Sequence, residues 1–364
     1  MTKTFQINKK SFINLTIIIF LVIIIVLYGG ATNNFDYETF KLSYNQVINT
    51  SFEPGYKLIE SLFYNANINF DLFRLIIALF CVTLFVVRVN EFVDQKYRLY
   101  IYLIYLLTVV PFYSYSLRSA IGFSIITFAF KYLATKKDKD LIKFIILVFI
   151  AGMFHTSSLI SMLFILIPIL NKKGFLNRSI IYLFYGSLLI LLVISPIITK
   201  TILDFIFNNI LIPIGVSETK IVYTDISVRF GFILFSLCQI MFVILLSFIK
   251  KRISFDLFQH ETFKLKSKLI IFTYDATLLM LMIIPILRIT TEYSRLIRGF
   301  SSLYYIAVFS SLSILSKRNK MIVSILLILT VTINFITFVY PYLEETFYPL
   351  FKENWIINIL LNIS

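Results

Sequence analysis

The sequence predicts an all-α, polytopic integral membrane protein. Of its 364 residues, 59% are hydrophobic and 15% are charged, whereas soluble domains are closer to half apolar and a quarter charged. Apolar runs of about 20 residues recur along the chain, which is the length that crosses a hydrocarbon core of about 30 Å. These runs predict about 10–12 transmembrane helices within one domain that covers residues 1–364.

The expected membrane spans follow the apolar runs in order. The first comes directly after a basic start, "MTKTFQINKK", and its apolar run is too long for the core of a signal peptide. We therefore expect this helix to remain in the protein as a first span. The expected helices are 12–29, 70–89, 98–116, 117–135, 141–154, 156–170, 179–195, 229–249, 268–286, 297–315 and 321–340.

The basic residues predict the orientation of these spans. With the N-terminus in the cytoplasm, the cytoplasmic segments hold about two thirds of the 34 Lys and Arg residues. The same bias accounts for the net charge of +15 without a nucleic-acid partner. It leaves three long segments outside, at about 30–69, 196–228 and 341–364, and we expect short interfacial helices there.

One of the two histidines, His155, lies in the apolar stretch "FIAGMFHTSSLI". The basic segments on either side of this region are both predicted to be cytoplasmic, yet only about 30 residues separate them. Either two short helices turn at "GMFHTSS", which places His155 near the outer face, or one long tilted helix replaces them. His155 is then a packing residue or, since ionisable groups in membranes tend to be functional, a base.

Five arginines fall on the predicted outer side, where the positive-inside rule disfavours them. Arginine holds phosphate groups with two donors and keeps its charge, so this set suits a pyrophosphate ligand. The alternative is that these side chains reach to lipid headgroups. The candidates for pyrophosphate binding are Arg118, Arg229, Arg288, Arg295 and Arg298.

Other polar residues add to the candidate chemistry. Asp36 and Glu53 lie in the first outer loop, where they are ordinary loop acids or proton acceptors. Asp275 stands in an apolar run, so we expect it to pair with a basic residue of another helix. The two cysteines both sit in apolar runs and form no metal motif, and the sequence has none of the common phosphate-loop, zinc-hydrolase or serine-hydrolase signatures. We expect neither a metal nor another cofactor.

The central stretch "SLRSAIGFSIITFAFKYLATKKDKDLIKFIILVFIAGMFHTSSLI" resembles EpsG-type (Wzy-like) bacterial polysaccharide polymerases. In that family a helix beginning Arg-Gln-x-x-Ala leads through a basic turn to a Phe-His-x-Ser element. The stretches "FDYETF", "FEPGYKLIESLF" and "SRLIRGFSSLYY" are similar to further family motifs, in the family's order. Ser119, Gly122 and Phe40 depart from the pattern, because the family usually has Gln, Ala and Tyr there.

The resemblance implies a glycosyltransferase of the bacterial cytoplasmic membrane. It would join oligosaccharide repeat units carried on undecaprenyl pyrophosphate, on the outer face, into O-antigen, capsule or exopolysaccharide. A flippase and a chain-length regulator are the implied partners. Within this interpretation Arg118, Arg288, Arg295 and Arg298 stabilise the leaving pyrophosphate, and His155, Asp36 or Glu53 accepts the hydroxyl proton.

Aromatic residues of the outer segments are the expected sugar contacts, namely Tyr37, Tyr56 and Tyr293. Other interpretations stay open at this point. A lipid-linked glycan ligase would use the same arginines with a different acceptor. A flippase or transporter would need polar residues along the whole membrane depth, and only Arg74 and Asp275 hint at such depth. A structural subunit would use its outer loops for docking.

Overall fold

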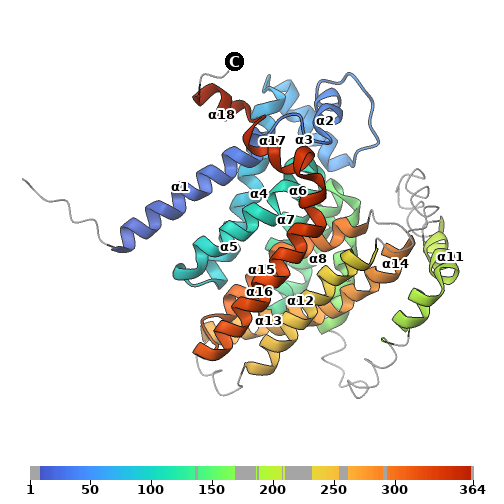
Figure 1. Ribbon diagram of the computed structural model, residues 1–364. Coiled ribbons are helices and arrows are strands. Elements are labelled where there is room, and N and C mark those ends of the chain that lie inside the picture. The colour runs from blue at the N-terminus through green and yellow to red at the C-terminus, as the bar shows by residue number, and fades with distance from the viewer. Residues whose placement is uncertain are drawn as a thin grey trace, which may run out of the picture.

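The computed structural model describes residues 9–135, 138–168, 186, 188–206, 208–209, 232–253, 261–289 and 293–361. These residues form helices joined by short connections (Figure 1). The only pairing of β type among them is an isolated bridge between Ala31 and Asn354. The predicted all-α class is therefore confirmed.

The first group of helices lies before the first long gap in the described residues. They are α1 (Lys9–Gly30), α2 (Tyr37–Tyr44), α3 (Pro54–Asn65), α4 (Phe70–Phe92), α5 (Gln95–Thr108), α6 (Val110–Tyr115), α7 (Leu117–Thr135), α8 (Asp138–Phe154) and the 3-10 helix η1 (Thr156–Ile165). The later ones are α11 (Pro196–Ile206), α12 (Phe232–Arg252), α13 (Glu261–Leu279), η5 (Met280–Met282), α14 (Ile283–Ile289), α15 (Ser294–Ser311), α16 (Lys317–Phe338), η7 (Tyr340–Tyr342), η8 (Leu343–Phe347), α17 (Tyr348–Phe351) and α18 (Trp355–Leu360).

Several of these helices are long and apolar enough to cross a membrane. In the described part of the chain there are five, and six if the pair Leu188–Ile194 and Pro196–Ile206, bent by 103°, counts as one span. The protein is thus a multi-pass membrane protein, as predicted, and the total of about 10–12 spans stays a prediction. The five are Phe70–Phe92, Leu117–Ala134, Phe232–Arg252, Phe263–Ile289 and Lys317–Phe351.

Helix α7 is the centre of the bundle. It contacts α4, α6, α8, η1, α13 and α15, and 78% of its span Leu117–Ala134 is buried inside the protein. A helix that is largely apolar all round packs against neighbours on most sides, although α7 also buries a few hydroxyl groups such as those of Ser119 and Ser124. Outer helices instead expose large aliphatic side chains, as α1 does at Ile18 and Val22, where we expect lipid.

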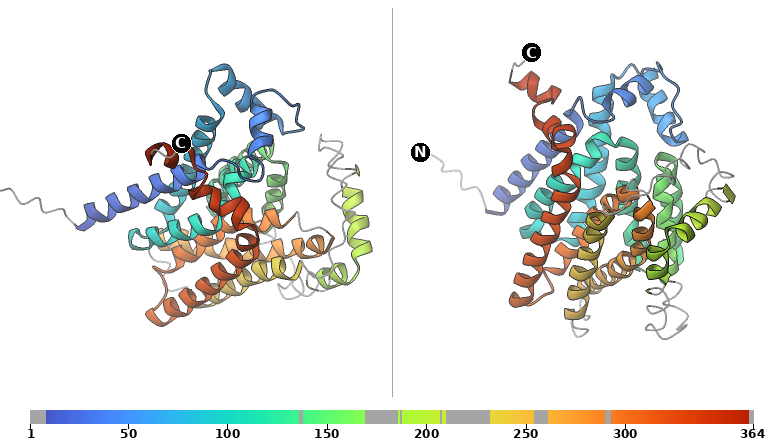
Figure 2. Two further views of the ribbon diagram at one scale, coloured as in Figure 1. Left: turned by 45° about the horizontal axis from the view of Figure 1, so that its top comes forward. Right: turned by 45° about the vertical axis from the view of Figure 1, so that its right-hand side comes forward.

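One end of the bundle carries a cap, which we define as residues 31–69 and 340–361. Its helices α2, α3, α17 and α18 gather at the same end in every view, so two of the three segments predicted to lie outside share one side (Figures 1 and 2). Arg74, on the first turns of α4, holds this end together. Its guanidinium donates to the carbonyls of Ala31 and, at 3.0 Å, Ser114. The ring of Tyr37 lies 5.0 Å from it.

The opposite end is held by ion pairs between helices. Lys250 of α12 contacts Asp275 of α13 at 3.0 Å, which confirms the expected partner on another helix. Lys266 contacts Asp94 at 2.7 Å and links α13 to the residue that precedes α5. Asp275 and Arg74 thus have structural partners at opposite ends of the bundle. Neither residue therefore supports the row of polar side chains across the membrane that a transporter would need.

Asn354 fastens the C-terminal part of the cap to the end of α1. Its side chain is fully buried and donates to the carbonyls of Val26 and Leu350, at 2.9 and 3.0 Å. Its carbonyl oxygen accepts from the first backbone N–H groups of α18, at Ile356 and Ile357. One amide side chain therefore caps a helix and joins the two ends of the chain.

We expect Asn354→Ala to destabilise the cap by about 1–3 kcal/mol, because the substitution leaves buried carbonyl and N–H groups unpaired. Thermal unfolding in lipid nanodiscs, with hydrogen exchange of residues 355–361, measures the effect. Asn358→Ala in the same helix is the control, since no hydrogen bond of the Asn358 side chain is seen among the described residues. Equal unfolding curves for the two variants would refute this role.

Candidate functional site

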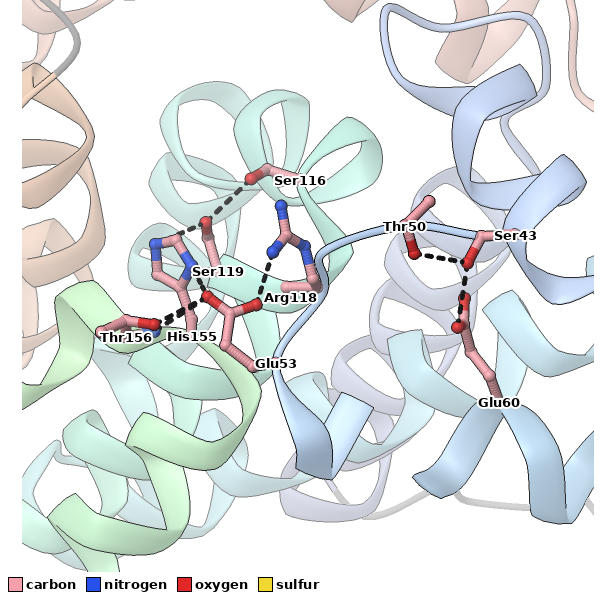
Figure 3. Close-up of polar contacts among 9 residues, drawn as sticks. All are labelled: Ser43, Thr50, Glu53, Glu60, Ser116, Arg118, Ser119, His155 and Thr156. Atoms are coloured by element: carbon pink, nitrogen blue, oxygen red, sulfur yellow. Dashed lines mark hydrogen bonds and ion pairs between the residues drawn. The ribbon is translucent and has the colours of Figure 1, made fainter. Parts of the chain in front are cut away.

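Three of the candidate residues meet beneath the cap, although they are far apart in the sequence. Glu53 precedes α3, Arg118 lies on the first turn of α7, and His155 joins α8 to η1. Figure 3 shows their side chains converging on the Glu53 carboxylate. We call Glu53, Arg118, His155 and their partners Ser116, Ser119 and Thr156 the Glu53 cluster.

The chain turns at His155 because this residue leaves the helical conformation. Its backbone is extended, with φ −153° and ψ 108°, and α8 before it contacts η1 after it. The alternative of two short helices that turn at "GMFHTSS" is therefore correct, and the single long helix is not formed. The turn leaves the first N–H groups of η1 without partners in their own helix.

Glu53 supplies the partner that η1 lacks. Its Oε1 accepts from the backbone N and the Oγ1 of Thr156, at 3.1 and 3.0 Å. Its Oε2 accepts from Nη1 of Arg118. The Glu53 residue is only 8% exposed, so its charge is compensated by these donors rather than by water. A carboxylate at the N-terminus of a helix is also favoured by the helix dipole.

Arg118 is held in place but keeps donor capacity. Its guanidinium lies over the ring of Phe52, 4.2 Å from the ring centre, and farther from that of Phe40. About a quarter of the side chain is exposed, whereas its Nε is buried and has no hydrogen-bond partner among the described residues. Glu53 thus orients one edge of the guanidinium and leaves the exposed part of the group for an anion.

Both ring nitrogens of His155 face polar groups. Its Nε2 lies 3.1 Å from Oγ of Ser119, and its Nδ1 lies 3.8 Å from Oε1 of Glu53. Ser116 donates to Ser119 at 2.9 Å, which extends the cluster to the residue between α6 and α7. Phe123 contacts the imidazole edge-on, at 6.0 Å between ring centres. His155 is 7% exposed, so the ring is almost fully enclosed.

Two glycines allow these elements to come so close. A Cβ on Gly55 would lie 2.8 Å from the carbonyl oxygen of Met153, where α3 packs against the end of α8. A Cβ on Gly122 would collide with Oγ of Ser158 and lie 3.1 Å from Cβ of His155. Close approach at these two places brings Glu53 onto α8 and His155 onto α7.

Arg298 joins the same region through α6. Its Nη1 donates to the hydroxyl of Tyr115 at 2.7 Å, and its guanidinium lies 4.2 Å from the ring centre of Phe112. Tyr115 ends α6, directly before Ser116. At the junction between α6 and α7, Tyr115 therefore contacts Arg298 and the next residue, Ser116, belongs to the Glu53 cluster.

The other residues predicted to bind pyrophosphate or to act as a base lie outside the Glu53 cluster, and one of them lies outside the described residues. Arg288 is half-buried in the last turn of α14, and Arg295 is half-buried in the first turn of α15. Asp36 directly precedes α2 and is also half-buried. Arg229 lies outside the described residues. The pyrophosphate and base roles of these residues stay predictions.

The tyrosines expected to contact sugar have different surroundings. Tyr56 is fully buried between Phe40 and Phe73, and Tyr37 is 6% exposed with its hydroxyl donating to Asp71 at 2.8 Å. Tyr293 is half-buried beside α15. Burial gives Tyr37 and Tyr56 a packing role in the cap. Sugar contact by the three tyrosines stays a prediction.

Sequence reasoning missed the hydroxyl groups of the site. Ser116 directly precedes α7 and Ser119 lies on its first turn, and this spacing brings their hydroxyl groups within hydrogen-bonding distance. The contact between the two serines could have been predicted from their Ser-x-x-Ser spacing, but the contact of Ser119 with His155 could not. Thr156 follows His155 directly and is the natural partner for a carboxylate that caps η1.

A second buried carboxylate lies in the cap near the Glu53 cluster. Glu60 of α3 is 5% exposed, and its Oε2 accepts from Oγ of Ser43 at 3.1 Å, which in turn contacts Thr50 (Figure 3). Burial raises the pKa of the Glu60 carboxyl from 4.5 to about 7, although the Ser43 hydrogen bond and the charges of Arg118 and Lys57 oppose the rise.

The raised pKa of Glu60 predicts a pH-dependent stability. Below pH 4.5 the carboxyl is protonated in the folded and unfolded states, so its effect on stability is absent there. As the pH rises through about 7, the unfolded state ionises first and the folded state loses stability. Glu60→Gln should therefore raise the unfolding temperature at pH 8 and change it little at pH 4.5. Thermal unfolding in nanodiscs at both pH values tests this.

The control for that experiment is Glu38→Gln, which removes an exposed carboxylate from the same cap. Its effect on the unfolding temperature should be small, because the side chain is exposed. A stabilisation by Glu60→Gln that is equal at pH 4.5 and pH 8 would contradict the account of Glu60.

Comparison with known proteins finds a matching family. The sequence model of the EpsG family matches residues 14–351, which is nearly the whole chain and includes all members of the Glu53 cluster. No curated protein and no solved structure matches the chain. In the part of the chain that the structure describes, no group of His, Cys, Asp and Glu side chains is arranged to hold a metal ion. The chain belongs to the EpsG family.

Proposed function

We propose that this protein polymerises lipid-linked oligosaccharide repeat units on the outer face of the bacterial cytoplasmic membrane. Membership of the EpsG family and the multi-pass helical fold fit a role in making polysaccharide. The observation that carries the proposal is the Glu53 cluster. It combines a partly exposed arginine, a buried carboxylate and a histidine under the cap, from three separate parts of the chain.

Arg118 takes the role of anion holder in this proposal. The donor substrate ends in a pyrophosphate, and its departure leaves negative charge that a fixed guanidinium stabilises. Glu53 fixes Arg118 through Nη1, while the partly exposed remainder of the guanidinium is oriented for the phosphate oxygens. Arg298, held by Tyr115 beside the same junction, is the second candidate for this role.

His155 takes the role of base. Glu53 is the weaker candidate, because three donors already occupy its oxygens. A hydroxyl at the non-reducing end of one lipid-linked unit attacks the anomeric carbon of the other glycan. The hydroxyl oxygen forms the new glycosidic bond, its proton passes to His155, and the bond to undecaprenyl pyrophosphate breaks with its electron pair. The lengthened glycan stays on the acceptor lipid.

Replacing Arg118 tests this function. In cells that lack the gene, Arg118→Ala should leave single repeat units on the final acceptor and lower the amount of longer glycan at least about 100-fold, since it removes a donor to the leaving group. Arg118→Lys keeps the charge but not the two-pronged geometry, so it should restore only part of the ladder. Glycan gels, with membrane levels of each variant measured by blot, provide the readout.

Arg318→Ala is the matched control, because it removes an exposed arginine at the start of α16, in a predicted cytoplasmic segment. A full ladder from Arg118→Ala would contradict the proposal. Loss of the single unit as well would favour a glycan ligase. Lipid-linked units that accumulate on the cytoplasmic side would favour a flippase instead.

A further inference from the structure

His155 presents a difficulty for any mechanism in which it acts directly on substrate. Its Nε2 is contacted by Ser119, and its Nδ1 faces Glu53. Neither ring nitrogen is thus open to an incoming sugar hydroxyl. If His155 is the base of the proposed reaction, the proton must reach it through a neighbouring group.

The direction of the hydrogen bonds identifies that group. Ser116 donates its hydroxyl proton to Oγ of Ser119, 2.9 Å away. The Ser119 oxygen is therefore an acceptor toward Ser116, and its own proton is left to point at Nε2 of His155, at 3.1 Å. An Nε2 that accepts a hydrogen bond carries no proton, so the proton of the neutral imidazole sits on Nδ1, on the side of Glu53.

We infer that Ser116 and Ser119 form a hydroxyl relay that fixes the tautomer of His155 and delivers the substrate proton to its Nε2. The delivery of the substrate proton rests on the proposed function. The fixing of the tautomer is a property of the folded protein and needs no substrate. Ser119 is almost fully buried, at 1% exposure, so water does not compete for its hydrogen bond to His155, and Ser116 is the end of the relay farther from the imidazole.

The relay balances as follows. The acceptor sugar hydroxyl gives its proton to Oγ of Ser116 while the Ser116 proton moves to Ser119 and the Ser119 proton moves to Nε2. Both serines end as hydroxyls, and the sugar oxygen keeps the electron pair that forms the glycosidic bond. His155 becomes an imidazolium whose Nδ1–H faces the Glu53 carboxylate at 3.8 Å. This carboxylate stabilises the positive charge that arises.

Nuclear magnetic resonance of the imidazole nitrogens tests the tautomer directly. The chain has two histidines, so 15N-histidine labelling of the full-length protein in nanodiscs gives two imidazoles, and His260→Gln assigns them. We expect His155 to carry its neutral proton on Nδ1. In Ser119→Ala this preference should be lost, and in Ser119→Thr, which keeps the hydroxyl, it should remain. A wild-type proton on Nε2 would overturn the inference.

The control is Ser158→Ala. Ser158 is fully buried next to Gly122, and its hydroxyl has no hydrogen-bond partner among the described residues. This variant makes the same chemical change close to His155 and should leave the tautomer as in the wild type. A change of tautomer in Ser158→Ala equal to that in Ser119→Ala would mean that general loosening of the packing, not the relay, sets the imidazole.

The second readout is elongation of the lipid-linked unit that accumulates in cells lacking this gene. Ser119→Ala and Ser116→Ala should each lower the elongation rate about 10- to 100-fold, the range that a proton-transfer group supplies. Ser119→Thr, which keeps the hydroxyl, should recover part of that loss, and Ser158→Ala should keep the rate within about twofold. Unchanged rates in both alanine variants would overturn the relay. If the wild-type protein elongates no glycan, the proposed function is overturned. This outcome is seen in the wild type alone and so is distinct from a failure of the relay.

Discussion

The outer end of this protein depends on the hydrogen bonds that the buried carboxylate of Glu53 accepts. Glu53 belongs to the cap, and its carboxylate contacts α7 through Arg118 and the start of η1 through Thr156. A buried charge without partners would cost several kcal/mol, so the donors around it must stay in place. The position of Arg118 and the orientation of His155 both follow from this requirement.

The central place of α7 gives that interaction its rigidity. This helix is buried on most sides and carries Arg118 and Ser119 on its first turn, directly after the junction that also holds Arg298 through Tyr115. A functional group on a buried helix end is held more precisely than one on a loop. The cap contributes Glu53 and covers the cluster, and Asn354 fastens the other part of the cap to α1.

The helices could be predicted from the sequence because the thickness of a membrane sets the length of an apolar run. The span 117–135 was expected and is observed as α7, whereas the expected span 98–116 is divided at Val109 into α5 and α6. The contact between Glu53 and Arg118 could not be predicted, because 65 residues separate them and no local pattern joins them. Tyr56, an expected sugar contact, is fully buried, and Ile59 and Phe63 of the same helix pack against the core beside it.

A double-variant cycle on the elongation rate tests most directly whether Glu53 and Arg118 work as one unit. The rates of Glu53→Gln, Arg118→Lys and the double variant are compared with the wild type. Because Glu53 acts by holding Arg118, the double variant should elongate glycan no more slowly than the slower single variant. Losses that multiply would show that the two residues act independently, and this would contradict the account.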